Sequence, residues 1–270
     1  MPKAQINGVE IYYSLEGSGP ETIVFLNGIM MNTLSWNAFV PVLTETNNYR
    51  FLRVDFRDMG FSSPYKDDYD VSIHVDDLKG LFDELGLEKV HLMGVSYGAM
   101  VAMLFALKYP DYLSTLILPN CVAQVTKFLQ AASDIWEYSA ATNSGELFFK
   151  LSMPFIYSDD FYNRNWQWLK EREAIFDQIL TKEYFEALNR LSRSSKDFDI
   201  LDQIHRIKTP TLLIAGTRDI ITPVYEMKKI QERIENARMV IIEGAGHASF
   251  YEKMDEFVTA VLGFIALHHS

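Results

Sequence analysis

The sequence predicts an α/β protein in which helices cover both faces of a mostly parallel sheet. Short β-branched runs alternate with longer stretches whose apolar residues recur at helical spacing. The chain has 270 residues, 48% of them hydrophobic, which is enough to bury one large core as a single domain.

The first 120 residues contain six predicted strands. Residues 5–13 alternate in polarity around Asn7-Gly8, a pair typical of hairpin turns, so they predict two antiparallel strands. Four buried strands follow and alternate with helices. We expect these strands at residues 22–27, 51–55, 90–94 and 113–118, and the helices at 36–46, 72–85 and 97–109.

The middle of the chain, residues 121–205, loses the strand pattern and becomes helical in period and rich in aromatic side chains. Strands resume at 211–215 and 238–242, with helices at 224–234 and 249–267. We therefore predict that residues 1–120 and 206–270 form one core, and that residues 121–205 form a helical lid rather than an independent domain.

The formal net charge of −11, without any cluster of Lys and Arg, excludes a nucleic-acid partner. The first residues lack the apolar run of a secretory signal, and no stretch reaches the ~20 apolar residues that span a bilayer. The single cysteine, Cys121, allows no intrachain disulfide and is interpreted as a buried apolar side chain. We expect a cytoplasmic protein with a small-molecule partner. The sequence leaves homo-oligomerisation open.

The strongest local signal is residues 94–98 (GVSYG), where a predicted strand ends and a helix begins. The motif G-x-S-x-G in this context predicts a nucleophile elbow. Such a turn is so tight that the serine adopts a strained backbone conformation, and its neighbours two residues away must lack bulk. Ser96 is the predicted nucleophile. The alternative is a glycine-rich turn that carries an ordinary serine.

A serine hydroxyl needs an adjacent base, and the base needs a carboxylate. His247, in residues 244–247 (GAGH), follows the last predicted strand, and Asp219, in residues 216–219 (GTRD), follows the strand before it. The chain order Ser, Asp, His suits this arrangement, and all three follow the carboxyl ends of strands, where open α/β sheets bind ligands. The alternatives are a surface histidine and an aspartate that caps a helix.

An oxyanion hole requires two N–H donors that are aimed at the developing charge. We expect one from Tyr97 and the other from Ile29, in the loop of residues 27–30 (NGIM). These residues and the aromatic lid predict an apolar pocket with few polar anchors. The predicted substrate-binding residues are Asn27, Gly28, Met30, Asn120 and Trp136.

The whole chain resembles the α/β-hydrolase superfamily, in the lidded branch that holds esterases and enol-lactonases. The elbow, Asp219 and His247 match the pattern of that family, and residues 55–62 (DFRDMGFS) are similar to its D-x-R-G-x-G-x-S turn. The resemblance implies a mostly parallel eight-stranded sheet with a helical lid after the sixth strand. It also implies a serine hydrolase without cofactor or metal, acting on a carboxylic ester or lactone.

The chain departs from the family pattern at two positions. Asn27 stands where many relatives have His. An asparagine at this position, together with Asn120, resembles the 3-oxoadipate enol-lactonases. The loop that contains Asn27 is equally similar to the Asn-Gly-Ala-Met loop of an acyltransferase that joins 3-hydroxyacyl chains. Asp58 replaces the usual Gly of the conserved turn. Because Asn120 is an amide where some relatives carry the triad carboxylate, Asp219 is the candidate acid.

The resemblance leaves other functions open. The same triad serves acyltransferases, which pass the acyl group to an alcohol or thiol, and cofactor-free perhydrolases or haloperoxidases, which use hydrogen peroxide. A receptor-like protein of this fold would bind a ligand without turnover, because a fold alone does not fix a function.

Overall fold

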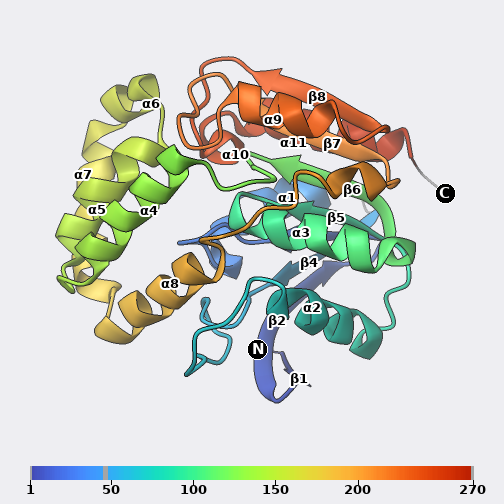
Figure 1. Ribbon diagram of the computed structural model, residues 1–270, viewed down its shortest axis with the longest axis horizontal. Coiled ribbons are helices and arrows are strands. Elements are labelled where there is room, and N and C mark those ends of the chain that lie inside the picture. Colours follow the sequence, from blue (N-terminus) through green and yellow to red (C-terminus); the bar gives the residue numbers. More distant parts are fainter. Residues whose placement is uncertain (1, 45–47, 269–270) are drawn as a thin grey trace.

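The computed structural model describes residues 2–44 and 48–268. Within these residues the sheet has eight strands, in the order β1-β2-β4-β3-β5-β6-β7-β8 (Figure 1). The hairpin strands β1 and β2 are antiparallel to their neighbours, and the other strands run parallel. The strands are β1 Lys3–Ile6, β2 Val9–Gly17, β3 Glu21–Leu26, β4 Tyr49–Val54, β5 Val90–Gly94, β6 Leu113–Pro119, β7 Thr211–Gly216 and β8 Ala237–Ile242.

Helices cover both faces of the sheet. In the buried strand β3, Val24 and Leu26 belong to one core cluster, and Ile23 and Phe25 to the other. The alternation follows from the two-residue period of a strand. The first cluster is covered by α2 Ile73–Glu84, α3 Tyr97–Lys108 and α9 Val224–Gln231, and the second by α1 Phe39–Thr44, α10 Ser249–Glu252 and α11 Met254–Ala266.

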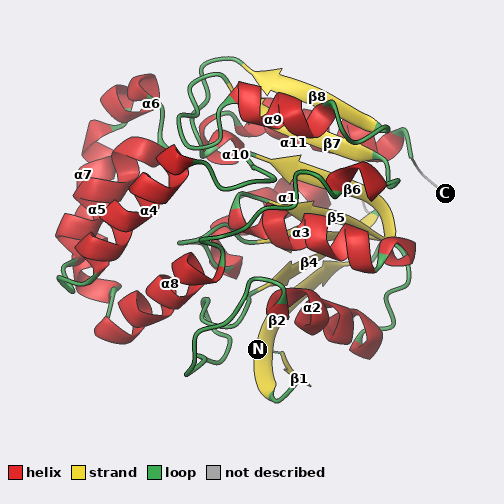
Figure 2. Ribbon diagram, viewed as in Figure 1, coloured by secondary structure: helices red, strands yellow, loops and turns green. Residues whose placement is uncertain are grey.

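A helical insert lies between β6 and β7. It consists of α4 Lys127–Ala140, α5 Gly145–Ile156, α6 Asp159–Arg164, α7 Trp166–Ile179 and α8 Lys182–Ser194. Figure 2 shows α4, α5 and α7 side by side, set apart from the sheet, with α8 closer to it. The helices pack on one another because each has an apolar stripe, in α8 formed by Phe185, Leu188 and Leu191.

The structure confirms the predicted fold class, with differences at the ends of elements. The predicted helix 36–46 divides into a 3₁₀ turn, Thr33–Trp36, and the helix α1, and the end of the prediction lies outside the described residues. The predicted final helix is two helices, because Lys253 leaves the helical region of backbone space, with φ −136° and ψ 55°. No helix within the described residues has the length and apolarity needed to cross a bilayer.

Candidate active site

The turn that carries Ser96 has the backbone strain that its sequence predicts. Ser96 lies between β5 and α3 with φ 52° and ψ −110°. A Cβ on Gly94 would lie 2.2 Å from the carbonyl oxygen of Gly98, and a Cβ on Gly98 would lie 2.6 Å from that of Leu26. Both glycines are therefore required by the close approach of backbone to backbone. The turn holds the serine hydroxyl above the carboxyl end of β5.

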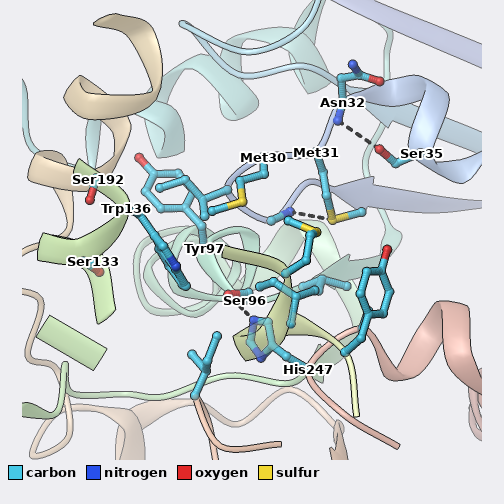
Figure 3. Close-up of a pocket in the computed structure, with 18 of the residues that line it drawn as sticks. Met30, Met31, Asn32, Ser35, Ser96, Tyr97, Ser133, Trp136, Ser192 and His247 are labelled. Carbon is cyan, nitrogen blue, oxygen red and sulfur yellow. Dashed lines mark hydrogen bonds between the residues drawn. The ribbon is translucent and has the colours of Figure 1, made fainter. Parts of the chain in front are cut away.

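Three loops at the carboxyl ends of β5, β7 and β8 bring Ser96, Asp219 and His247 together. The Nε2 atom of His247 lies 3.0 Å from Ser96 Oγ (Figure 3), and its Nδ1 atom lies 2.9 Å from Asp219 Oδ2. Asp219 and Ser96 lie 28 and 151 positions before His247 in the sequence, and the order of the strands in the sheet brings the three residues together. The geometry allows a proton to pass from the hydroxyl to the imidazole.

The Asp219 carboxylate is buried and accepts several hydrogen bonds. Its Oδ1 atom accepts from the backbone N–H groups of Ile221 and Thr222, at 2.8 and 2.9 Å. Burial works to raise the pKa of Asp219, but the charge of His247 and hydrogen bonds from His247 and Thr222 hold this pKa below its usual value. The carboxylate therefore stays ionised beside the imidazole.

Asn120 was predicted to contact substrate, and the structure corrects this. Its side chain is fully buried and does not line the pocket. It donates to Asp219 Oδ2 at 2.8 Å and accepts a hydrogen bond from the hydroxyl of Ser249. Asn120 lies beside the carboxylate, away from the cavity, because β6 neighbours β7 in the sheet. Its amide supports Asp219 rather than a ligand.

The prediction that Asn27 contacts the substrate is corrected in the same way. Asn27 is fully buried below the loop that follows β3 and outside the lining of the pocket. Its amide donates to the carbonyl oxygen of Val54 at 2.9 Å and to Asp55 Oδ1 at 3.0 Å, and its oxygen accepts from Trp36 Nε1 at 2.8 Å. These three bonds satisfy the side chain, so Asn27 fixes the loop and has no free group for a substrate.

The loop after β3 and the first turn of α3 both contribute residues to the wall of the cavity. Ile29 and Tyr97 both line it, as do Gly28 and Met30. Neither the Ile29 N–H nor the Tyr97 N–H donates to a protein group in the described part of the chain. Met30 has φ 74°, and the N–H of Met31 donates to the carbonyl oxygen of Gly28 at 3.1 Å, which tightens the loop.

A cavity of about 600 Å³ lies between the core and the helical insert. Ser96 and His247 lie at its floor, and Figure 3 shows Trp136, Ser133 and Ser192 of the insert facing them across the cavity. The wall is largely apolar and includes Met100, Leu129, Phe149, Met153, Ile156, Trp168 and Phe176. Of the predicted substrate-binding residues, Gly28, Met30 and Trp136 line this cavity.

Sequence analysis missed several residues of the site. Thr222 donates from its hydroxyl to Asp219 at 2.5 Å, and Ser249 supports Asn120 from the start of α10. The only signal for Thr222 is its position three residues after an aspartate, where Asp side chains commonly accept backbone N–H bonds. Ser249 carries no such signal. In the described residues, no three His, Cys, Asp or Glu side chains gather as metal ligands would.

The turn of residues 55–62 carries a second departure from expectation. Asp58 has φ 63°, which Gly adopts more readily, and its carboxylate accepts hydrogen bonds from Arg190 of α8 at 2.6 and 3.1 Å. The turn is held by Asp55, which accepts hydrogen bonds from the backbone N–H groups of Thr33 and Phe61, at 2.7 and 3.0 Å. Asp58 thereby joins the core to the insert.

Comparisons with known proteins agree with this fold. A solved α/β-hydrolase enzyme, MGS-M2 from a Medee basin deep-sea metagenome library, is 36% identical, with a TM-score of 0.94 over 98% of this chain and 97% of that one. The solved enol-lactonase from Burkholderia xenovorans is 25% identical, with a TM-score of 0.84 over 98% and 100%. A proline iminopeptidase from Lactobacillus helveticus is 26% identical, covering 98% of this chain and 97% of the relative. The alpha/beta hydrolase fold model matches residues 21–254, and the chain belongs to that family of hydrolases.

Proposed function

We propose that this hydrolase cleaves a small to medium carboxylic ester or lactone through an acyl-enzyme formed on Ser96. The observation that carries the proposal is the continuous hydrogen-bonded chain from Ser96 Oγ through His247 to Asp219. In this reading Ser96 is the nucleophile, His247 the general base and acid, and Asp219 the group that orients the imidazole.

In the first step, the Ser96 hydroxyl attacks the substrate carbonyl while His247 Nε2 takes its proton. The imidazolium that forms is stabilised by the ionised Asp219 at Nδ1. The oxyanion of the tetrahedral intermediate accepts hydrogen bonds from the N–H groups of Ile29 and Tyr97. Removing one such donor typically costs about 10²–10³ in rate. Collapse expels the alkoxide, which takes the proton from His247.

In the second step, water enters, loses a proton to His247 and attacks the acyl carbonyl of the Ser96 ester. The same two N–H groups stabilise the second oxyanion, and the proton returns to Ser96 Oγ as the acid leaves. The acyl-enzyme bond that forms in the first step is thereby broken in the second. The reaction consumes only the substrate and one water molecule, and it regenerates the free Ser96 hydroxyl.

A peptidase acting on an amine or imine terminus is the second candidate, because a curated relative is a proline iminopeptidase. Such a substrate brings a cation, which calls for an unpaired carboxylate in the pocket. The two carboxylates that line the cavity, Asp134 and Glu137, are paired with Lys196 at 3.7 Å and with Arg193 at 2.7 Å. This pairing favours the ester over the cationic amide.

The other rivals differ in what they consume. An acyltransferase would form product only with an alcohol or thiol acceptor and would hydrolyse slowly without one. A perhydrolase would require hydrogen peroxide. A receptor-like protein would bind a ligand without turnover.

The experiment measures hydrolysis of p-nitrophenyl esters of two to eight acyl carbons, simple lactones and proline p-nitroanilide by wild type, Ser96→Ala and Ser133→Ala. Ser133 also lines the cavity, so its variant is the matched control. We expect ester or lactone turnover, a loss of at least ~10⁴-fold in Ser96→Ala, and stoichiometric labelling of Ser96 by a fluorophosphonate. Turnover that survives in Ser96→Ala would contradict the mechanism, and a preference for the anilide would replace the ester assignment.

A further inference from the structure

The charges that line the cavity do not balance. Five ionised side chains line it among the described residues, with two carboxylates against three cations: Asp134, Glu137, Arg172, Arg193 and Lys196. The cavity therefore carries a formal charge of +1, although the whole chain carries −11. A net positive charge in the cavity favours anions there, although the protein as a whole is acidic.

Four of these charges cancel in pairs. The Arg193 guanidinium donates to Glu137 at 2.7 Å, and Lys196 Nζ lies 3.7 Å from Asp134. Asp134 and Glu137 lie in α4, Arg193 lies in the last turn of α8, and Lys196 follows the end of α8. The members of both pairs already have partners, so they offer little net charge to a ligand.

Arg172 is the charge that remains. It lies in α7 (Figure 1), and no Asp or Glu among the described residues lies within 4.0 Å of its guanidinium. Its side chain is exposed to solvent as well as lining the cavity, which places it at the rim. A cation in this position can bind an anionic group of a substrate without first breaking an ion pair.

The guanidinium of Arg172 is nevertheless held in place. It lies over the ring of Trp168, 4.9 Å from the centroid, and Trp168 stacks on Tyr251 at 5.5 Å with an interplanar angle of 29°. Trp168 and Tyr251 also line the cavity. Stacking occupies the face of the guanidinium and leaves its N–H edge available for a bidentate contact with a carboxylate.

We propose that Arg172 binds a carboxylate on the substrate, so that the preferred ester or lactone carries a free acid group remote from the scissile carbonyl. The proposal rests on the proposed function and narrows its substrate class. The apolar wall between the two sites then accommodates the carbon chain that links the ester to the acid. Arg172 is in this reading a specificity-determining residue that takes no part in the bond-making steps.

The test compares paired substrates that differ in one group. Monomethyl esters of linear dicarboxylic acids with four to ten carbons are set against methyl alkanoates of matched length, and methanol release is measured with wild type and Arg172→Gln. The matched control is Arg164→Gln, which removes an exposed arginine of α6 outside the cavity. Thermal melting verifies that each variant is folded.

We expect kcat/KM for the best monomethyl dicarboxylate to fall about five- to tenfold in Arg172→Gln, while the matched alkanoate changes less than twofold. Arg164→Gln should leave both unchanged. Raising the salt concentration from 0.02 to 0.5 M should weaken only the charged substrate, because an exposed ion pair is screened. The chain length with the highest kcat/KM then reports the spacing between Ser96 and Arg172.

Two outcomes separate this inference from the proposed function. Equal losses on charged and neutral substrates in Arg172→Gln, or no loss on either, would overturn the carboxylate assignment while leaving the esterase intact. Turnover of the neutral esters by Ser96→Ala would overturn the proposed function itself.

Discussion

At the scale of single residues, the site depends on conformations that the surrounding chain enforces. A non-glycine residue with the backbone angles of Ser96 costs about 1–3 kcal/mol, which neighbouring contacts must offset. The N–H of Ser96 donates to the carbonyl oxygen of Pro119 at 3.2 Å, and that of Gly98 donates to the carbonyl oxygen of Val95 at 2.8 Å. The strained backbone of Ser96 is thus held by β6 and by the start of α3.

The Asp219 carboxylate is predicted to act through the tautomer of His247. In Asp219→Asn the amide can present its NH₂ group to Nδ1, which favours the tautomer whose Nε2 carries a proton and cannot accept one from Ser96. We expect kcat for the best ester to fall by about 10⁴ with KM little changed. Asp67→Asn, an exposed residue of the same type, should be silent. A loss below tenfold in Asp219→Asn would show that another group orients the imidazole.

At the scale of elements, α8 forms hydrogen bonds with the core close to the turn that carries Ser96. Its residue Arg190 pairs with Asp58, and Ser194 Oγ lies 2.7 Å from the hydroxyl of Tyr97, a residue that lines the cavity. The N–H of Val71 also donates to the carbonyl oxygen of Ser194 at 3.0 Å. We infer that α8 is the fixed edge of the insert and that any opening of the cavity moves other helices.

The Asp58–Arg190 pair can be tested apart from the strained backbone of Asp58. Asp58→Ala and Asp58→Gly both remove a carboxylate that is fully buried. Asp58→Ala should lower the free energy of unfolding by about 3 kcal/mol, the low end for a broken buried pair. Only Ala keeps a Cβ at φ 63°, so Asp58→Gly should be about 1 kcal/mol more stable than Asp58→Ala.

Urea unfolding of the two Asp58 variants and wild type measures both terms, and hydrogen exchange along α8 reports whether the helix is released. A variant Asp58→Gly as stable as wild type would show that the ion pair contributes no more than the ~1 kcal/mol that removing the Cβ can recover. Equal stability of the Gly and Ala variants would show that the left-handed backbone carries no cost here.

At the scale of the whole molecule, the spacing of apolar residues and the order of the elements along the chain predicted the fold. The prediction of the site was limited because the sequence does not show in which direction a side chain points. The sheet, the insert and the grouping of residues 96, 219 and 247 follow from where strands end. Asn27 and Asn120 each follow the carboxyl end of a strand, as the triad residues do, but their side chains form hydrogen bonds with buried groups and not with the cavity. Arg172 lies in α7, a helix with many charged residues. Only its packing against Trp168, which the sequence does not reveal, distinguishes it from the other charged residues of that helix.

The dependence of global stability on pH should reveal a buried histidine, His74, that takes no part in the proposed reaction. His74 is fully buried in α2, its ring stacks on Phe56 with centroids 4.7 Å apart, and its Nε2 lies 2.9 Å from the hydroxyl of Tyr97. Burial, and then the charge of Arg57, lowers the pKa of His74 to about 3.

The native state therefore keeps His74 neutral over a range in which the unfolded chain, with a histidine pKa near ~6.5, binds a proton. Its contribution to stability is complete above pH ~6.5 and is lost progressively as the pH falls toward 3. Between pH 7.5 and 5.5 this loss amounts to roughly 1 kcal/mol. His74→Gln keeps a polar side chain but does not titrate. The difference in unfolding free energy between these two pH values, measured in urea, should therefore be smaller in the variant by that amount. All other titrating groups are shared and cancel in the comparison. An identical difference in wild type and variant would mean that His74 gains its proton in the native state as readily as in the unfolded chain.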